Sequence, residues 1–129
     1  MKTTRVLVAA AVLAVSGIAI AQPPQGITRT DALRHDLQHG HEAIQVRVDF
    51  APGVSFPFHS HPGVELAYVI EGSMEYQLEG QPPVILKAGE SLFISAGVNH
   101  SARAVGPTKA AELATYLVEK NKPILVLKK

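Results

Sequence analysis

The sequence contains no cysteine. This absence excludes disulfide bonds and thiolate metal ligands, and it also excludes the lipid-bearing cysteine that tethers some exported bacterial proteins. A small domain without disulfides has to be stabilised by its apolar core, by oligomerisation or by a bound metal.

Charge of one sign is also scarce. The formal net charge of the 129 residues is only +1, and no stretch gathers Lys and Arg into a basic stripe. DNA and RNA are therefore not expected as partners. Hydrophobic residues make up 47% of the chain and charged residues 18%, which predicts a packed core and, at this length, one domain.

The one long hydrophobic run lies near the N-terminus, over residues 6–20, behind a short basic start. Ala19-Ile20-Ala21 offers small residues at the positions that a signal peptidase reads. A membrane anchor is the alternative, but the run is shorter than the roughly 20 residues of a spanning helix and is interrupted by Ser16-Gly17. We predict a cleaved secretory signal over residues 1–21 and a periplasmic or extracellular product that is free of the membrane.

The remaining chain has the pattern of β-structure after an extended N-terminal segment, residues 22–42, whose consecutive prolines near the start forbid a helix. Short apolar or alternating runs recur between Gly- and Pro-containing turns, which favours a sandwich or barrel over residues 43–120. Residues 121–129 are expected to form a tail or an edge strand. The expected strands cover residues 44–50, 65–70, 74–78, 84–86, 91–95 and 109–120, the last of which also has the composition of a helix.

One expected strand has no polar face. Residues 66–70 are all apolar or aromatic, so both of its faces should be covered. A second subunit, and hence a homodimer, or the N-terminal segment would supply this cover. A central position under the protein's own loops is an equally good interpretation.

Three potential metal ligands lie close together in the chain: His59, His61 and Glu65. Their equal parity places them on one face of an extended segment. In a straight strand Glu65 would lie about 13 Å from His61, too far for both to bind one ion. A bend is therefore required, and Pro62-Gly63 supplies residues that interrupt a strand.

A fourth donor, His100, follows a small-residue turn at the end of another expected strand. Three imidazoles and one carboxylate suit iron, manganese, nickel, zinc or copper rather than calcium or magnesium. His-x-His alone is often a pair of exposed histidines, but Glu65, the bend and His100 together favour a site for one divalent transition metal.

The run from Gly53 to Gly72 resembles the first motif of the cupin superfamily, with both glycines, both histidines and the glutamate in place. Gly89, Gly97 and His100 are similar to its second motif, although Ser95 stands where the family usually has proline and Ala104 where it often has asparagine. The resemblance covers roughly residues 44–119.

This resemblance to small single-domain cupins implies an all-β double-stranded β-helix, a jelly-roll-like barrel, with the metal inside and often a dimer. It also implies that residues 109–120 form a closing strand. The implied function is that of a metalloenzyme of dioxygenase, isomerase or lyase type acting on a small oxygen-containing molecule. The alternative is a non-catalytic small-ligand binding or sensing module with a structural metal. No residue identifies a general base.

Other residues give weaker signals. The cluster His35, His39 and His41 is expected to be a solvated edge or loop rather than a second metal site. Arg47 lies on the polar parity of its strand and is expected to face outward rather than to hold an anionic substrate. Tyr68 is out of phase with Glu65 and should point away from the metal, and Ala67, in phase, has no chemistry. Aromatic residues of the expected strands are candidates for a pocket but are more commonly core: Phe58, Tyr76 and Phe93.

Overall fold

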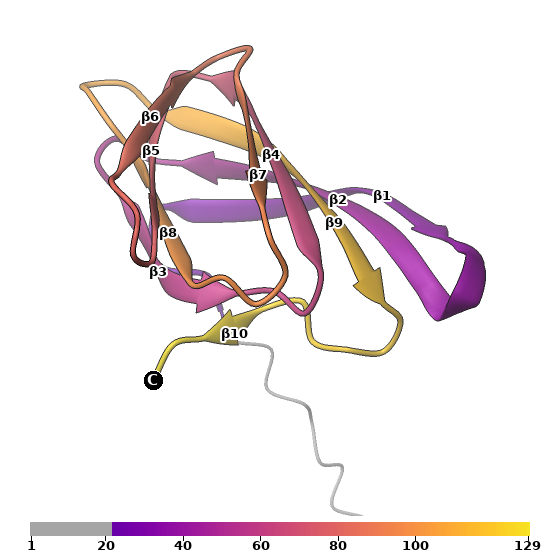
Figure 1. The fold of residues 1–129 in the computed structure, drawn as a ribbon. Coiled ribbons are helices and arrows are strands. Elements are labelled where there is room, and N and C mark those ends of the chain that lie inside the picture. Colours follow the sequence, from indigo (N-terminus) through magenta and orange to yellow (C-terminus); the bar gives the residue numbers. More distant parts are fainter. Residues whose placement is uncertain (1–21) are drawn as a thin grey trace, which may run out of the picture.

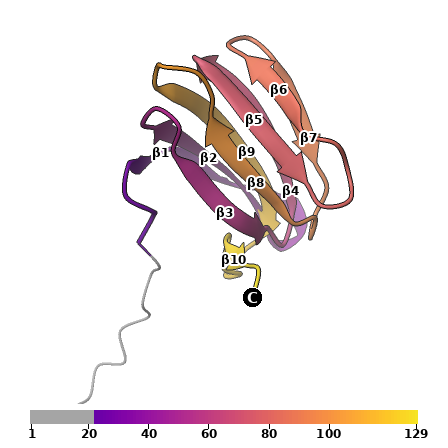
Figure 2. The same ribbon diagram turned by 90° about the vertical axis from the view of Figure 1, so that its left-hand side faces the viewer.

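The computed structural model describes residues 22–129, so the predicted signal segment, residues 1–21, lies outside the described residues. Two antiparallel five-stranded sheets pack face to face (Figures 1 and 2). In the described part of the chain the only helical element is a single 3-10 turn, η1. The elements are β1 (Ile27–Asp36), η1 (Gln38–Gly40), β2 (His41–Phe50), β3 (Ser55–Ser60), β4 (Val64–Glu71), β5 (Ser73–Leu78), β6 (Val84–Lys87), β7 (Ser91–Ile94), β8 (His100–Ala104), β9 (Ala110–Glu119) and β10 (Val126–Leu127).

The chain passes back and forth between the sheets. The first sheet has the order β1-β2-β9-β4-β7 and the second the order β10-β3-β8-β5-β6. Strands that follow each other in the chain, such as β3 and β4 or β7 and β8, lie in opposite sheets. This is the jelly-roll-like double-stranded β-helix expected from the sequence, and the predicted fold class is confirmed.

Alternation along the strands builds the core between the sheets. In β2 the residues Ile44, Val46, Val48 and Phe50 are buried, and the polar residues between them face outward. The ambiguous segment over residues 109–120 forms β9, as predicted, and pairs with both β2 and β4. A strand wins over a helix here because β9 fills the centre of the sheet between two others.

Both ends of the described chain supply edge strands. The N-terminal segment forms β1, which pairs with β2 from Ile27 to Asp36, and the C-terminal segment contains β10, which pairs with β3. In both ribbon views β10 lies at one end of the barrel, beside β3 (Figures 1 and 2).

The part of the first sheet's outer face formed by β4, β7 and β9 is apolar and exposed. Leu66, Tyr68, Phe93 and Leu117 are each between 38% and 57% exposed. An aromatic residue in a strand was expected to be core, but Phe93 is not. Its parity in β7 points it outward beside Leu66. Loops do not cover this face in the described chain, and a second subunit that would cover it stays a prediction. No helix within residues 22–129 is long and apolar enough to cross a membrane.

Candidate metal centre

The bend predicted at Pro62-Gly63 is the passage from one sheet to the other. β3 ends at Ser60 and β4 begins at Val64, so His61 lies in the connecting loop and Glu65 on the opposite sheet. The loop passes so close to β9 that a Cβ on Gly63 would lie 1.9 Å from the carbonyl oxygen of Leu117. Glycine is needed there because any side chain would collide with backbone.

His59 and His100 meet across a strand pair. His100 begins β8, and its Cα is the register partner of the Cα of His59 in β3. Directly opposite residues of an antiparallel pair place their side chains side by side on the same face. The second sheet therefore presents two imidazoles toward the interior, opposite Glu65 of the first sheet.

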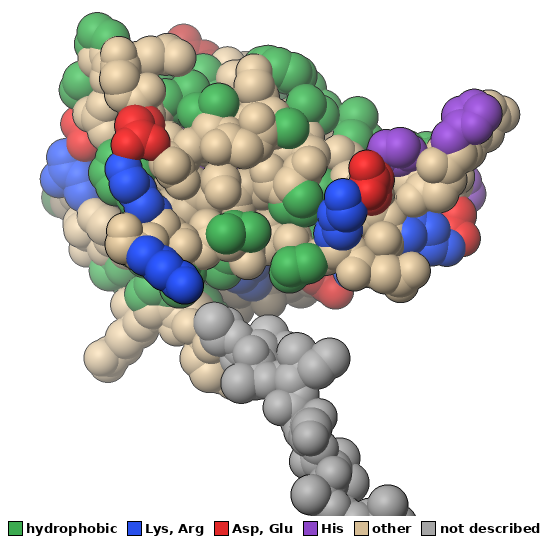
Figure 3. Space-filling model, turned by 60° about the horizontal axis from the view of Figure 1, so that its bottom comes forward, with side chains coloured by type: hydrophobic (Ala, Val, Ile, Leu, Met, Phe, Trp, Pro, Cys, Tyr) green, Lys and Arg blue, Asp and Glu red, His purple; other side chains and the backbone are tan. Residues whose placement is uncertain are grey.

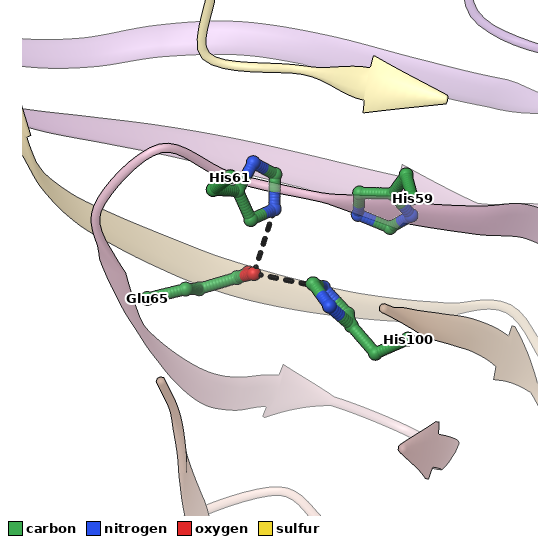
Figure 4. Close-up of side chains that lie close together, drawn as sticks. All are labelled: His59, His61, Glu65 and His100. Carbon is green, nitrogen blue, oxygen red and sulfur yellow. Dashed lines mark hydrogen bonds and ion pairs between the residues drawn. The ribbon is translucent and has the colours of Figure 1, made fainter. Parts of the chain in front are cut away.

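The four side chains converge in the barrel interior (Figure 4). One potential ligand atom from each of His59, His61, Glu65 and His100 lies within 4.8 Å of the others. Glu65 Oε2 lies 3.0 Å from His61 Nε2 and 3.1 Å from His100 Nε2. Every member of the cluster is at most 6% exposed.

Backbone carbonyls hold all three imidazoles in one orientation. The Nδ1 atoms of His59, His61 and His100 lie 2.8, 2.6 and 2.9 Å from the carbonyl oxygens of Pro57, Ile124 and Val98. A carbonyl can only accept, so each Nδ1 carries the proton and donates it. The lone pair of a neutral imidazole is then on Nε2, which is how backbone or carboxylate partners orient metal-binding histidines.

His61 Nε2 shows that this cluster fits a metal. The atom is buried and makes no well-aligned hydrogen bond in the described structure, although Glu65 Oε2 lies 3.0 Å away. An unpaired buried nitrogen is costly unless a ligand satisfies it. With His59, His100 and Glu65 around the same point, the donor set suits one divalent transition metal.

The pKa values of this cluster favour a ligand set that is largely deprotonated. Burial, helped by the charge of His100, lowers the pKa of His59 to about 3. Burial alone would raise the pKa of Glu65, but the hydrogen bond with His100 and the adjacent imidazole of His61 outweigh it and lower the pKa to about 2. For His100 burial acts downward, yet the hydrogen bond to Glu65 prevails and raises the pKa.

A second buried carboxyl, Glu112 of β9, was not predicted. Its side chain is 5% exposed and accepts a short hydrogen bond from the Tyr76 hydroxyl. Burial, with the charge of Glu65, raises the pKa of Glu112 to about 7. The signal was present in the predicted strand, because Glu112 shares parity with the inward-facing Ala114 and Tyr116, but an acidic residue is rarely expected in a core.

The weaker predicted residues lie away from the centre. His35, His39 and His41 are exposed around the β1–β2 hairpin, where histidines gather at a projecting tip (purple in Figure 3), so the expected solvated edge is confirmed. Among residues 22–129, the only group of three or more potential donors close enough to share an ion is the buried one. Arg47 faces outward and pairs with Asp49 and Glu71.

The predicted aromatic candidates differ in their burial. Tyr76 is buried in the core and 1% exposed. Phe58 is only partly buried and lies under the Lys128 ammonium group, 5.8 Å from the ring centroid, so it does not line the metal centre. Tyr68 is 44% exposed on the outer face, as its parity predicted.

Comparison with known proteins agrees with this architecture. The family model of the cupin domain matches residues 46–117, more than half of the chain. The chain therefore belongs to the cupin family.

The proteins that resemble the chain include two curated proteins and a solved structure. It is 37% identical over 63 residues to dimethylsulfoniopropionate lyase DddQ of Ruegeria pomeroyi, covering 48% of this chain and 31% of the lyase. It is 33% identical over 84 residues to oryzines biosynthesis cluster protein J of Aspergillus oryzae, covering 65% and 46% of the two chains. A structure of oxalate oxidase superposes with a TM-score of 0.67 and 28% identity, over 81% of this chain and 56% of the oxidase. The chain thus spans less than half the length of the curated relatives it matches.

Proposed function

We propose that this protein is a metalloenzyme that holds one divalent transition metal with His59, His61, Glu65 and His100 and acts on a small oxygen-containing molecule. One observation carries the proposal: four donor atoms face one point, while the Nδ1 atoms of all three imidazoles are already committed to backbone carbonyls. Core histidines that served packing alone would not need three matched tautomers around a carboxylate.

The four residues would have two kinds of role as ligands. His59, His61 and His100 would offer neutral Nε2 atoms, and Glu65 would offer the negative charge. A metal at this site would supply Lewis-acid or redox chemistry. The barrel wall excludes water from the ligands, which are at most 6% exposed.

The relatives guide the choice of chemistry. The lyase is named for dimethylsulfoniopropionate, and the oxidase for oxalate, with a further structure of it in complex with glycolate. All three molecules are small carboxylates. A lyase or oxygen-dependent reaction on a small carboxylate is accordingly the first activity to test, and we also propose export of the mature chain, on the strength of the N-terminal sequence.

A second candidate function is small-ligand binding or sensing without catalysis. It is supported by the shortage of polar groups near the metal ligands, where the ring of Tyr116 lies 4.6 Å from that of His61 and the ring of Phe56 lies 4.7 Å from that of His59. Tyr116 is buried, and burial raises the pKa of its hydroxyl, which keeps it protonated and unavailable as a general base near neutral pH.

Elemental analysis of the protein, purified without chelator, tests the proposal. We expect about one equivalent of a transition metal in the wild type and none in His59→Ala/His61→Ala. The matched control is His35→Ala/His39→Ala, which removes two exposed histidines from the hairpin and should keep the metal. Absence of metal in the wild type, or equal loss in both variants, would refute the metal centre.

The identity of the metal then separates the two functions. Iron, manganese or copper with an exchangeable water, detected by water-proton relaxation or electron paramagnetic resonance, would support catalysis. Zinc that exchanges no water and cannot be removed without unfolding the protein would support the sensing or structural role.

A further inference from the structure

A pocket of about 1050 Å³ is lined by residues of the two edge strands β1 and β10, which belong to opposite sheets. The C-terminal segment lies across this end of the molecule (Figure 1). Apolar side chains form most of the lining, among them Ile27, Val46, Phe56 and Ile124. Its size is that of sites that take small molecules, which are usually apolar with a few well-placed polar groups.

Residues of the inner wall of the pocket contact two of the candidate metal ligands. Phe56 lines the pocket and packs edge-on against His59, with ring centroids 4.7 Å apart. Ile124 lines it too, and its carbonyl oxygen accepts the hydrogen bond of His61 Nδ1. A molecule in this pocket would therefore be separated from His59 by Phe56 and from His61 by Ile124.

Arg29 is the charged group that the pocket presents in a partly buried position. Its guanidinium donates to the Tyr116 hydroxyl at 3.3 Å, and the ring of Tyr116 in turn lies 4.6 Å from that of His61. Among residues 22–129 no carboxylate forms an ion pair with Arg29, unlike Arg34, Arg47 and Arg103, which all have acidic partners. Asp31 and Lys129 also line the pocket, but both are exposed, and one carries a negative and the other a positive charge.

An unpaired guanidinium beside apolar walls is suited to one kind of ligand. Arginine offers five N–H donors in a planar fork, and the single hydrogen bond that Arg29 donates to Tyr116 within the described chain leaves most of them free. The fork matches a carboxylate in geometry and in charge. The apolar lining matches a hydrocarbon body attached to that carboxylate.

We propose that this pocket binds a small carboxylate with an apolar body, that Arg29 receives the carboxylate group, and that the apolar body lies against Val46 and Phe56 beside the metal ligands. The proposal deepens the proposed function, and rests on it for the presence of a metal beside this pocket. It gives Arg29 a binding role and Tyr116 the role of positioning the guanidinium.

Calorimetric titration of the purified protein with 3-methylbutanoate, and with its uncharged amide of the same shape, tests the proposal. The wild type should bind the carboxylate at least roughly tenfold more tightly than the amide. Arg29→Gln should weaken carboxylate binding by roughly tenfold to a hundredfold and remove the preference over the amide. Arg29→Lys, which keeps the charge but loses the fork, should fall between them.

The control variant is Arg103→Gln, which removes an arginine from an outer ion pair with Glu75 and should bind both probes like the wild type. Circular dichroism of each variant verifies that it is folded. Equal binding of acid and amide by the wild type, unchanged carboxylate binding in folded Arg29→Gln, or no binding of the acid by the wild type would each overturn the assignment.

Metal content measured on the same samples separates this inference from the proposed function. If the protein contains metal but Arg29→Gln binds the carboxylate as tightly as the wild type, the pocket assignment alone is overturned. A metal-free protein with Arg29-dependent binding would refute the metalloenzyme and leave the carboxylate site standing.

Discussion

Glu65 and Glu112 lie on neighbouring strands of the same sheet, and both are buried, with exposed fractions of 3% and 5%. Their pKa values nevertheless shift in opposite directions, to about 2 for Glu65 and to about 7 for Glu112. Burial raises both. The difference comes from the partners, because Glu65 has two imidazole nitrogens at 3.0 and 3.1 Å, whereas Glu112 has one phenol hydroxyl.

This contrast shows that one barrel interior holds two kinds of carboxyl. Glu65 is held as an anion, the form that a metal ligand requires. Glu112, with a pKa raised to about 7, is partly protonated near neutral pH. Pairs of carboxyls pushed apart in this way are typical of sites that combine an electrostatic role with a proton-transfer role.

The largest effect is expected from removing the anion. Glu65→Gln keeps the size of the side chain but loses its charge, and the affinity for the metal should fall by on the order of a thousandfold, more than the loss of an outer hydrogen-bond partner causes. Glu112→Gln is the matched control and should keep its metal. Competition with a chelator measures both affinities. Similar losses of metal affinity in the two variants would contradict the different roles given to Glu65 and Glu112.

The next effect concerns stability and pH. The folded pKa of Glu112, about 7, lies above its ordinary value of 4.5, so the folded state binds more protons between these values. The contribution is complete below pH 4.5 and is lost as the pH rises through 7. At about 1.4 kcal/mol per pH unit, this interval of 2.5 corresponds to on the order of 3 kcal/mol.

Urea unfolding of the wild type and Glu112→Gln across this range measures the effect. The wild type should lose stability relative to the variant as the pH rises from 4.5 to above 7. Parallel stability curves for the two proteins would show that Glu112 titrates normally.

A smaller effect is expected for metal affinity as a function of pH. His100 has a raised pKa, and its proton must leave before Nε2 can bind a metal. His59 and Glu65, with pKa values of about 3 and 2, have already lost theirs near neutral pH. Affinity should therefore rise by at least about tenfold per pH unit below the pKa of His100. An affinity that does not change with pH in this range would contradict the protonation state assigned to His100.

The smallest effect is expected from Tyr76→Phe. The Tyr76 hydroxyl stabilises the charged form of Glu112, so its removal should raise the pKa of Glu112 further and cost about 1 kcal/mol of stability. Carbon-13 NMR of the Glu112 carboxyl follows the titration directly. A pKa that falls in Tyr76→Phe would reverse the role given to this hydrogen bond.

Sequence reasoning reached the four clustered residues because local spacing carries most of that information. His59, His61 and Glu65 lie within seven positions of one another, and equal parity put them on one face. The need for a bend followed from distance alone. That the bend changes sheets did not, because sheet membership depends on long-range pairing that spacing does not contain.

The remaining features required the folded chain. The carbonyl that orients His61 belongs to Ile124, 63 positions away, in a segment with no distinctive sequence. Glu112 was overlooked although a strand was predicted there, because the central position of that strand follows from its pairing with β2 and β4. Arg29 lay in a segment interpreted only as extended, and its place beside Tyr116 depends on the pairing of β1 with β2 and of β2 with β9.

The central claim is that one metal ion lies among His59, His61, Glu65 and His100. Anomalous diffraction from crystals grown with the metal found in the purified protein tests it most directly. The account predicts a single strong peak about 2.0–2.3 Å from the three Nε2 atoms and from an oxygen of Glu65. A peak at the exposed histidines of the β1–β2 hairpin instead, or an interior site that stays free of metal while the imidazoles keep their hydrogen bonds, would contradict it.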